Sequence, residues 1–380
     1  MLAAYGHITR KKFTPRTLGL RGSTMENLVN QEFWRGKRVL ITGHTGFKGC
    51  WLSLWLSQYS AVIKGFSLPI SDKNYLYNKL NTDQLRLDET FADIRSYSEV
   101  KRVIAEFNPE IIFHMAAQPI VRHSYTDPVE TFTTNILGTI NILEAVRAEN
   151  INTTIVNITT DKCYENKGWI WPYREIDSLG GQDPYSASKA CSEIITHSYR
   201  NSFGEENSPF AIASARAGNV IGGGDMSEDR LVPDFLKALR SNKSITLRNP
   251  NSIRPWQYVL DPISGYLQLA QALYSNPMKF SSAWNFGPSE EAKSVGYLIK
   301  TLIDLSGAKS YKLEKKTAQP HEEKCLMLDS TRARTILNWR SKLDLRSCLT
   351  WTMDWHHAST EQSDMTEFSI SQIQRYCEIG

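Results

Sequence analysis

Short apolar runs alternate along the chain with longer segments whose apolar residues recur at helical spacing. The runs predict buried strands at residues 37–42, 61–67, 110–114 and 154–158 and the end of another strand at 91–94. Helices are predicted at residues 96–107 and 128–149, the latter from the spacing of Ile136, Ile140, Leu143 and Val146. Strands that alternate with helices favour an α/β fold with a parallel, doubly wound sheet.

The regular alternation ends soon after one further apolar run at residues 209–217. Three glycines at 222–224 and a polar stretch at 241–252 follow it, whereas a later segment at 261–274 is again helical in pattern and can pack back on the first domain. We therefore predict a smaller, partly interdigitated C-terminal domain that binds substrate. The predicted division is a leader at 1–24, a dinucleotide-binding domain at 25–213 and a substrate-binding portion at 214–380.

Composition places the chain among ordinary globular proteins. Its 380 residues are enough for one large or two closely packed domains, with 41% apolar and 22% charged residues. No uninterrupted apolar run approaches the length of a membrane span, so none is predicted. The net charge of +4 comes from the first 24 residues, which hold five basic residues and no acid. The rest is close to neutral, which gives no electrostatic basis for binding nucleic acid.

The leader and the cysteines bear on the compartment. A leader rich in Arg and Lys is typical of an organellar transit peptide, but it is also consistent with a non-native extension upstream of Met25; either way it is excluded from the fold. The six cysteines have no spacing that predicts a metal site, and we expect reduced thiols. Without a secretory signal pattern, a cytoplasmic protein is expected.

A glycine-rich turn at residues 43–49 (GHTGFKG) follows the first predicted strand and precedes a helical pattern. Glycines at this spacing permit a tight turn, a close approach to a pyrophosphate and a helix whose positive end faces the anion. A purely structural turn is the alternative, but the flanking strand and helix favour a Rossmann-type dinucleotide site. His44, within the turn, is expected to point to solvent.

The choice between NAD and NADP stays open at the end of the second strand. Residues 65–68 offer neither an acid for a ribose diol nor an arginine for a 2′-phosphate. Asp93 and Ile94, at the end of the third strand, are candidate adenine contacts. The alternative for Asp93 is that it caps the following helix.

Tyr185 and Lys189 are four residues apart, so a helix places the phenol and the ammonium on one face. Such a tyrosine can take a proton from a hydroxyl if the lysine and a cationic nicotinamide lower its pKa. A surface helix pair is the alternative in isolation. The position of the pair after the fifth predicted strand of a dinucleotide fold favours a catalytic role.

Four segments together resemble the extended short-chain dehydrogenase/reductase family, over nearly all of residues 37–350. They are residues 43–49, 114–117 (HMAA), 135–139 (NILGT) and 185–189 (YSASK). Three others are similar to the branch of CDP-glucose 4,6-dehydratases, namely residues 160–166 (TDKCYEN), 217–225 (AGNVIGGGD) and 254–259 (RPWQYV).

The resemblance implies a nucleotide-sugar lyase with NAD as its cofactor. Hydride leaves sugar carbon 4, water is eliminated across carbons 5 and 6, and the hydride returns to carbon 6 of a 4-keto-6-deoxy product. Such enzymes serve deoxysugar biosynthesis, including that of lipopolysaccharide, and the family's helix pairing implies a homodimer. From the cysteine spacing, the charge and the apolar runs described above, no metal, nucleic acid or membrane partner is expected.

Dehydration needs an acid and a base beyond those of a dehydrogenase. By resemblance, Thr160 bonds the carbon 4 oxygen beside Tyr185, Asp161 is the acid and Lys162 is the base. Many related dehydratases carry Asp-Glu here, so Lys162 departs from the wider pattern but matches the CDP-glucose branch. The alternative is a solvated Asp-Lys loop pair.

The remaining candidate contacts are also carried over from the family. The cofactor contacts are Gly43, Thr45, Gly46, Phe47, Gly49, Asp93, Ile94, Ala116, Ala117, Asn135, Tyr185 and Lys189. The substrate contacts are Asn219, Arg230 and Arg254, of which Arg254 offers a guanidinium fork suited to a diphosphate. Asn219 and Arg230 each have a purely structural alternative.

Two other functions share parts of this pattern. A nucleotide-sugar 4-epimerase uses the same fold with Thr160, Tyr185 and Lys189, but has no need of an Asp-Lys acid and base. A non-catalytic NAD-binding protein has no need of Tyr185 or Lys189. The Asp161-Lys162 pair therefore favours dehydration over both.

Overall fold

The computed structural model describes residues 29–70, 72–73, 75–204, 210–247, 249–307, 311–313 and 326–379. The predicted leader at 1–24 and Cys325 lie outside these ranges. Among the described helices, none combines the length and the apolar character needed to cross a bilayer.

Seven parallel strands form the central sheet of the described residues, in the order β3-β2-β1-β4-β5-β6-β11. Their bounds are β1 (Arg38–Thr42), β2 (Val62–Ser67), β3 (Leu87–Phe91), β4 (Ile111–His114), β5 (Thr153–Ile158), β6 (Phe210–Ala217) and β11 (Ala283–Phe286). The strand order reverses between β1 and β4, and ligands of open α/β sheets bind at such a point. The predicted doubly wound Rossmann sheet is confirmed.

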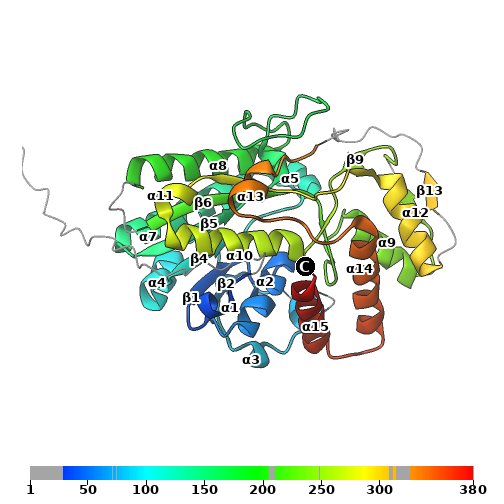
Figure 1. Ribbon diagram of the computed structural model, residues 1–380, viewed down its shortest axis with the longest axis horizontal. Helices are drawn as coiled ribbons and strands as arrows, with labels where there is room; N and C mark the ends of the chain where they lie inside the picture. The colour runs from blue at the N-terminus through cyan, green and yellow to red at the C-terminus, as the bar shows by residue number, and fades with distance from the viewer. Residues whose placement is uncertain are drawn as a thin grey trace, which may run out of the picture.

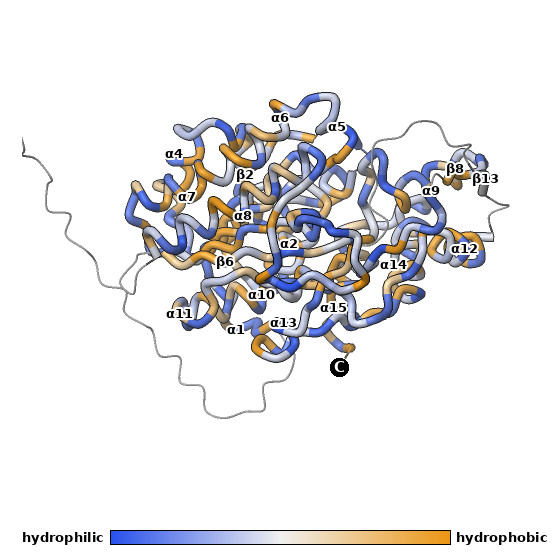
Figure 2. The backbone as a smooth tube through the Cα atoms, turned by 90° about the horizontal axis from the view of Figure 1, so that it is seen from above, coloured by the Kyte–Doolittle hydropathy of each residue, from blue (hydrophilic) through white to orange (hydrophobic). Residues whose placement is uncertain are grey.

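Helices cover both faces of this sheet (Figure 1). One face carries α2 (Phe47–Gln58), α10 (Leu260–Ser275) and α15 (Met365–Glu378), and the other carries α4 (Tyr97–Phe107), α7 (Gly138–Glu149) and α8 (Pro184–Phe203). Figure 2 shows α4 and α7 on one side of the strands and α10 on the other. Helix α2 is apolar on nearly all sides because it is enclosed between the sheet, α10 and α15.

The helix predicted at 128–149 is confirmed. It runs without a gap from α6 (Pro128–Phe132) through a π-helical segment at Thr133–Leu137 into α7. One feature of the sheet differs from the sequence prediction. Strand β11 was not predicted; it follows α10 and pairs with β6. The polar Asn285 interrupts this four-residue strand, so the sequence shows no continuous apolar run there.

A smaller group of elements lies beside the carboxyl ends of the strands (Figure 1). It includes β7 (Val220–Ile221), α9 (Leu231–Arg240), β8 (Ile245–Leu247), β9 (Ile253–Arg254), β10 (Gln257–Tyr258), β12 (Lys293–Ser294), α12 (Val295–Ser306), β13 (Tyr311–Leu313) and α14 (Leu345–Thr360). The chain returns to the main sheet through α10 and β11 between these elements, and the domain border near residue 213 stays a prediction.

The remaining elements are short connections. They are α1 (Gln31–Trp34), a 3-10 turn at Tyr77–Lys79, α3 (Thr82–Leu85), α5 (Val121–Thr126), a 3-10 turn at Asp161–Cys163, α11 (Pro277–Phe280) and α13 (Thr331–Ile336).

Candidate active site

One large cavity opens at the carboxyl ends of the central strands and continues beneath the smaller group of elements. Its volume is about 1460 Å³, well above the roughly 300–1,000 Å³ typical of a pocket for one small ligand. It is lined by the glycine turn, the segment after β4, the segment after β5, α8 and residues 217–234. This volume suits two ligands held side by side.

The glycine turn is shaped for close approach of a ligand to its backbone. Gly43 has a φ of +74°, and a Cβ there would lie 2.8 Å from the backbone nitrogen of Ala116. A Cβ on Gly49 would lie 2.2 Å from the carbonyl oxygen of Gly43. Gly46 is the N-cap of α2 and offers no side-chain cap, so N–H groups of the first helical turn face the cavity side without a capping oxygen. These residues fit the pyrophosphate of a dinucleotide.

His44 differs from the prediction that it points to solvent. Its side chain is fully buried, and its Nε2 lies 2.8 Å from Oε1 of Glu89 on β3. Burial lowers the pKa of His44, although Glu89 acts in the opposite direction. The ring occupies space that only glycine leaves on β2, because a Cβ on Gly65 would lie 2.6 Å from it. The spacing of the glycines in the turn does not indicate that Gly65 leaves space for the histidine ring.

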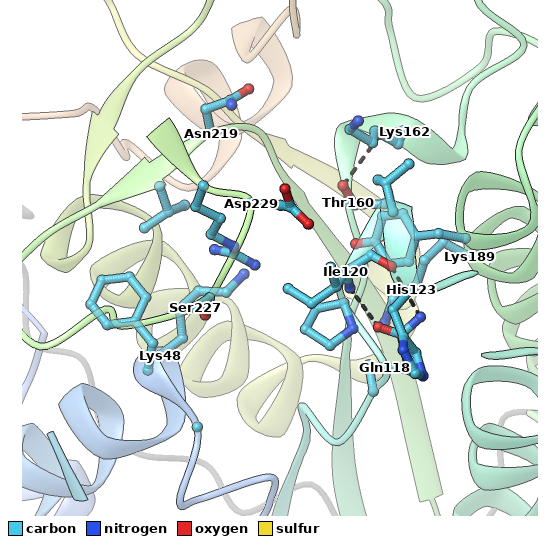
Figure 3. A pocket seen from close by; sticks show the side chains of 18 of the residues that line it. Lys48, Gln118, Ile120, His123, Thr160, Lys162, Lys189, Asn219, Ser227 and Asp229 are labelled. Atoms are coloured by element: carbon cyan, nitrogen blue, oxygen red, sulfur yellow. Dashed lines mark hydrogen bonds between the residues drawn. The ribbon is translucent and has the colours of Figure 1, made fainter. Parts of the chain in front are cut away.

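Lys48 is a cavity residue that the sequence reasoning missed. It follows Phe47 in the glycine turn, and Figure 3 shows its side chain among the residues that line the cavity. Burial, together with the charges of Arg230 and Lys189, lowers its pKa to about 7. Its place in the first turn of α2, beside the predicted contacts Phe47 and Gly49, is the signal that could have found it.

Asp93 and Ile94 both line the cavity after β3. The Asp93 carboxylate accepts from the backbone N–H of Arg95 at 2.8 Å and from its guanidinium, and this hydrogen bonding lowers the pKa of Asp93. The N-cap of α4 is Ser96. The alternative that Asp93 caps α4 is therefore wrong, and the carboxylate stays at the cavity edge beside an arginine.

Thr160, Asp161 and Lys162 follow β5 directly and line the cavity. Thr160 Oγ1 donates to Asp161 Oδ1 at 2.9 Å and accepts from the backbone N–H of Lys162 at 3.3 Å. Figure 3 shows Thr160 and Lys162 above Lys189. Burial raises the pKa of Asp161, against the opposing charge of Lys162. A carboxyl with a raised pKa is suited to deliver a proton.

Tyr185 and Lys189 lie on the first turns of α8, which begins at Pro184 with Asp183 as its N-cap. Burial raises the pKa of Tyr185 to about 12, and a hydrogen bond with Thr160 acts in the opposite direction. Burial lowers the pKa of Lys189 to about 8, and its Nζ donates to the carbonyl of Ile158 at 3.3 Å. Desolvation of the phenolate outweighs the contributions that favour it, and the lowering of this pKa by Lys189 together with a bound nicotinamide stays a prediction.

Asn135 is the one predicted contact that the structure places outside the cavity lining. It is buried in the π-helical segment, where its Nδ2 donates to the carbonyl of Gln118 and to Ser188 Oγ, and its Oδ1 accepts from the Gln118 N–H. Its side chain thus fixes the segment after β4 against α8. The structure gives Asn135 a supporting role there, and its direct contact with a cofactor stays a prediction.

The other predicted contacts share the cavity. They are Gly43, Thr45, Gly46, Phe47, Gly49, Asp93, Ile94, Ala116, Ala117, Thr160, Asp161, Lys162, Tyr185, Lys189, Asn219, Arg230 and Arg254. On the substrate side, Arg230 Nη1 lies 3.4 Å from Asp225 Oδ2, and Arg254 is buried. In the part of the chain that is described, no three His, Cys, Asp or Glu residues gather as metal ligands would.

A buried histidine lies behind the cavity floor. His114 at the end of β4 is hydrogen-bonded through Nδ1 to Thr42 Oγ1 at 2.8 Å and through Nε2 to Thr139 Oγ1 at 3.3 Å. Burial, with a smaller contribution from the charge of Lys189, lowers its pKa to about 3. The imidazole is therefore neutral in the folded protein over the physiological range.

This shift predicts a loss of stability in acid. The unfolded chain protonates His114 near its ordinary pKa of about 6.5, whereas the folded protein does not, so folding stability falls as the pH drops below about 6.5 and continues to fall toward about 3. Urea titrations between about pH 6 and pH 4.5 measure the free energy of unfolding. For each pH unit of acidification, this free energy should fall by about 1.4 kcal/mol less in the His114→Gln variant than in the unsubstituted protein. The exposed His197→Gln variant is the control and should keep the original slope. Equal slopes for all three proteins would contradict the assignment.

A model of one protein family matches residues 40–352, and its description is GDP-mannose 4,6 dehydratase. The match covers most of the chain, from β1 to α14. This chain belongs to that family. The matched range includes the glycine turn and every residue that lines the cavity.

Individual relatives agree with this assignment. The CDP-glucose 4,6-dehydratase of Salmonella typhimurium is 45% identical over 354 residues, which cover 92% of this chain and 98% of the relative. A UDP-glucose 4-epimerase from Thermotoga maritima, solved with UDP-glucose, has a TM-score of 0.74 at 21% identity and covers 85% of this chain and 99% of its own. A double mutant of the dTDP-glucose 4,6-dehydratase DesIV from Streptomyces venezuelae, solved with NAD, has a TM-score of 0.73 at 20% identity and covers 87% and 99%. The two solved structures establish the fold.

Proposed function

We propose that the protein is an NAD-dependent CDP-glucose 4,6-dehydratase, which converts CDP-D-glucose into CDP-4-keto-6-deoxy-D-glucose and water. The observation that carries the proposal is the convergence of Thr160, Asp161 and Lys162 with Tyr185 in one cavity. The 45% identical relative with that name supports the choice of substrate. An epimerase shares the tyrosine and the threonine but has no role for the Asp-Lys pair.

NAD is the proposed cofactor, and the glycine turn with Asp93, Ile94, Ala116 and Ala117 would hold it. The close backbone approach at Gly43 and the open N-terminus of α2 support this placement. The related dehydratase structure from Streptomyces venezuelae contains NAD. When bound, the nicotinamide supplies a reversible hydride acceptor, so the reaction has no net oxidation.

Tyr185 and Thr160 act at the carbon 4 hydroxyl of the sugar. The phenolate of Tyr185 takes the hydroxyl proton as carbon 4 becomes a ketone, and Thr160 holds the same oxygen. Lys189, four residues along α8, keeps a positive charge near the phenolate and favours its ionised form once substrate is bound. The ketone then acidifies the hydrogen on carbon 5.

Asp161 and Lys162 act at carbons 6 and 5. Lys162 removes the carbon 5 proton while Asp161 gives a proton to the carbon 6 hydroxyl, which leaves as water. The Lys162 ammonium returns its proton to carbon 5 as carbon 6 is reduced. Thr160 is hydrogen-bonded to both Asp161 and Tyr185, so the proton gained by Tyr185 has a path back to Asp161, and every group recovers its starting state.

The diphosphate of the substrate would be held on the opposite wall by Asn219, Arg230 and Arg254. Two guanidinium groups match the charge and the geometry of a diphosphate. Asp225 pairs with Arg230 and fixes its direction before substrate arrives.

The setting of the enzyme is part of the proposal. We place it in the cytoplasm, as a homodimer that supplies deoxysugars for polysaccharides such as lipopolysaccharide, with the domain division at residues 25–213 and 214–380. The free thiols of Cys50, Cys163, Cys191, Cys348 and Cys377 are consistent with a reducing compartment. Light scattering of the purified protein measures the oligomeric state.

A side-by-side assay tests the function. The purified protein with NAD is offered CDP-glucose, dTDP-glucose or GDP-mannose, and the 4-keto product is detected by its absorbance in alkali. We expect the largest kcat/KM for CDP-glucose. A larger value for another nucleotide would overturn the substrate, and epimerised sugar without any keto product would overturn the reaction.

A further inference from the structure

A buried ion pair lies directly behind the segment that carries Thr160, Asp161 and Lys162. Arg216 on β6 donates from Nη2 to Oε2 of Glu193 on α8 at 2.8 Å, and the two side chains are only 3% and 2% exposed. Burial raises the pKa of Glu193, but the Arg216 charge and the hydrogen bonds outweigh it and bring the pKa down to about 2. The pair therefore stays charged throughout the neutral range.

Both ends of the catalytic segment are attached to this pair. At the first end, Thr159 Oγ1 donates to Oε1 of Glu193. At the second end, Arg216 Nη1 donates to Tyr164 Oη at 2.7 Å, and the guanidinium lies 4.9 Å from the centroid of the same ring. Tyr164 Oη in turn donates to Asn285 Oδ1 on β11 at 2.8 Å. Residues 160–163 thus lie between two anchors that share one ion pair.

The same pair joins the other two segments of the active site. Glu193 follows Tyr185 and Lys189 at intervals of four residues, so the three side chains lie on one face of α8. Arg216 is next to the end of β6, immediately before residues 217–219, which line the substrate side of the cavity. One carboxylate and one guanidinium therefore fix the acid-base segment, the tyrosine helix and the substrate wall relative to one another.

The energetics also favour a positioning role over a purely stabilising one. A buried ion pair costs desolvation of two charges, and well-packed apolar side chains of similar volume often give equal or greater stability. The hydrogen bonds from Thr159, Ser214 and Arg216 use both oxygens of Glu193. An apolar pair would not hold the hydroxyl groups of Thr159 and Tyr164 in fixed directions.

We propose that Glu193 and Arg216 are positioning residues for the dehydration step, acting through Thr159 and Tyr164 on the placement of Asp161 and Lys162. This inference rests on the proposed function, because it assigns the positioned groups to elimination. It assigns no contact between the ion pair and substrate. Small displacements of catalytic groups are costly, since a misplacement of about 1 Å can reduce a rate by about a hundredfold.

The Thr159→Val variant tests this link without breaking the ion pair. Valine keeps the shape of threonine and removes only the hydroxyl that donates to Glu193. Thr196→Val is the matched control, because Thr196 is also buried, lies on α8 and makes hydrogen bonds to Asn157 and Ser192 that do not reach the segment. Thr159→Ser restores the hydroxyl. All variants are assayed with CDP-glucose and NAD, and the crystal structures of the two valine variants are determined.

For Thr159→Val we expect kcat to fall by about ten- to a hundredfold, with KM for CDP-glucose little changed. The reduced form of the cofactor should accumulate during turnover, because elimination slows more than the first hydride transfer. Thr159→Ser should recover most of kcat, and Thr196→Val should retain it. In the crystal, residues 160–163 should shift in Thr159→Val alone.

Equal kcat values for the two valine variants, or an unshifted segment in Thr159→Val, would overturn the positioning role. These results are distinct from failure of the proposed function, which would appear as absence of keto product from the unsubstituted protein. In that case the displacement of residues 160–163 in the crystal still decides whether Thr159 and Glu193 position the segment.

Discussion

Lys162→Ala should abolish dehydration while leaving oxidation of carbon 4 measurable. Removing the proposed base should lower the rate of elimination by about 10²- to 10⁴-fold, the range typical of a lost general base. Tyr185, Thr160 and Lys189 remain in place, so mixing the variant with CDP-glucose should still generate reduced nicotinamide in a single turnover. Stopped-flow absorbance measures that phase, and the alkaline keto-sugar assay measures the product.

A nearby lysine provides the control for this variant. Lys167 lies beyond the 3-10 turn, is about half exposed and pairs with Glu165 at 3.5 Å. Lys167→Ala should dehydrate CDP-glucose at the original rate. If Lys162→Ala also did so, Lys162 would not be the base. If it instead lost the oxidation phase and the elimination together, the residue would serve binding or folding.

Tyr185→Phe should depress both halves of the reaction. Phenylalanine leaves no oxygen to accept the carbon 4 proton, so the ketone on which elimination depends does not form. We expect the single-turnover formation of reduced nicotinamide and the overall kcat to fall together by about 10²- to 10⁴-fold. This joint loss distinguishes the tyrosine from Lys162, whose removal separates the two phases.

Tyr199→Phe is the matched control on the same helix. Tyr199 donates to Glu144 at 3.2 Å, away from the cavity lining, and its loss should leave kcat unchanged. Urea unfolding of both variants reports any change in folding stability. Normal turnover by Tyr185→Phe would mean that another group takes the carbon 4 proton.

Local sequence signals predicted the parts of the site that depend on spacing within one segment. The glycines at 43, 46 and 49 and the Tyr185–Lys189 pair could be found because a turn and a helix fix their geometry without reference to the rest of the chain. The segment 160–162 was placed at the cavity because it follows a buried strand whose carboxyl end faces the ligand side of the sheet.

The features that were missed depend on neighbours distant in sequence. His44 is buried because Gly65 on β2 leaves space for its ring and Glu89 on β3 receives its nitrogen. Asn135 lies outside the cavity because Gln118 and Ser188 satisfy its amide.

The same holds for strand β11 and for the link between Glu193 and Arg216. Strand β11 is recognised as a strand because it pairs with β6. The ion pair joins α8 to β6, and the two residues are 23 positions apart. Hydrophobic periodicity carries no record of such partners, so the sequence alone could predict neither strand β11 nor this ion pair.

The fate of the carbon 4 hydrogen tests the central claim most directly. The protein is given CDP-glucose deuterated at carbon 4 in ordinary water. An equal amount of substrate that is uniformly labelled with carbon-13 but carries no deuterium is present to detect exchange between molecules, and the product is analysed by NMR and mass spectrometry. An internal hydride cycle at one cavity predicts deuterium at carbon 6 of the same molecule. Loss of the deuterium to water, or its transfer to the carbon-13 molecules, would contradict the account.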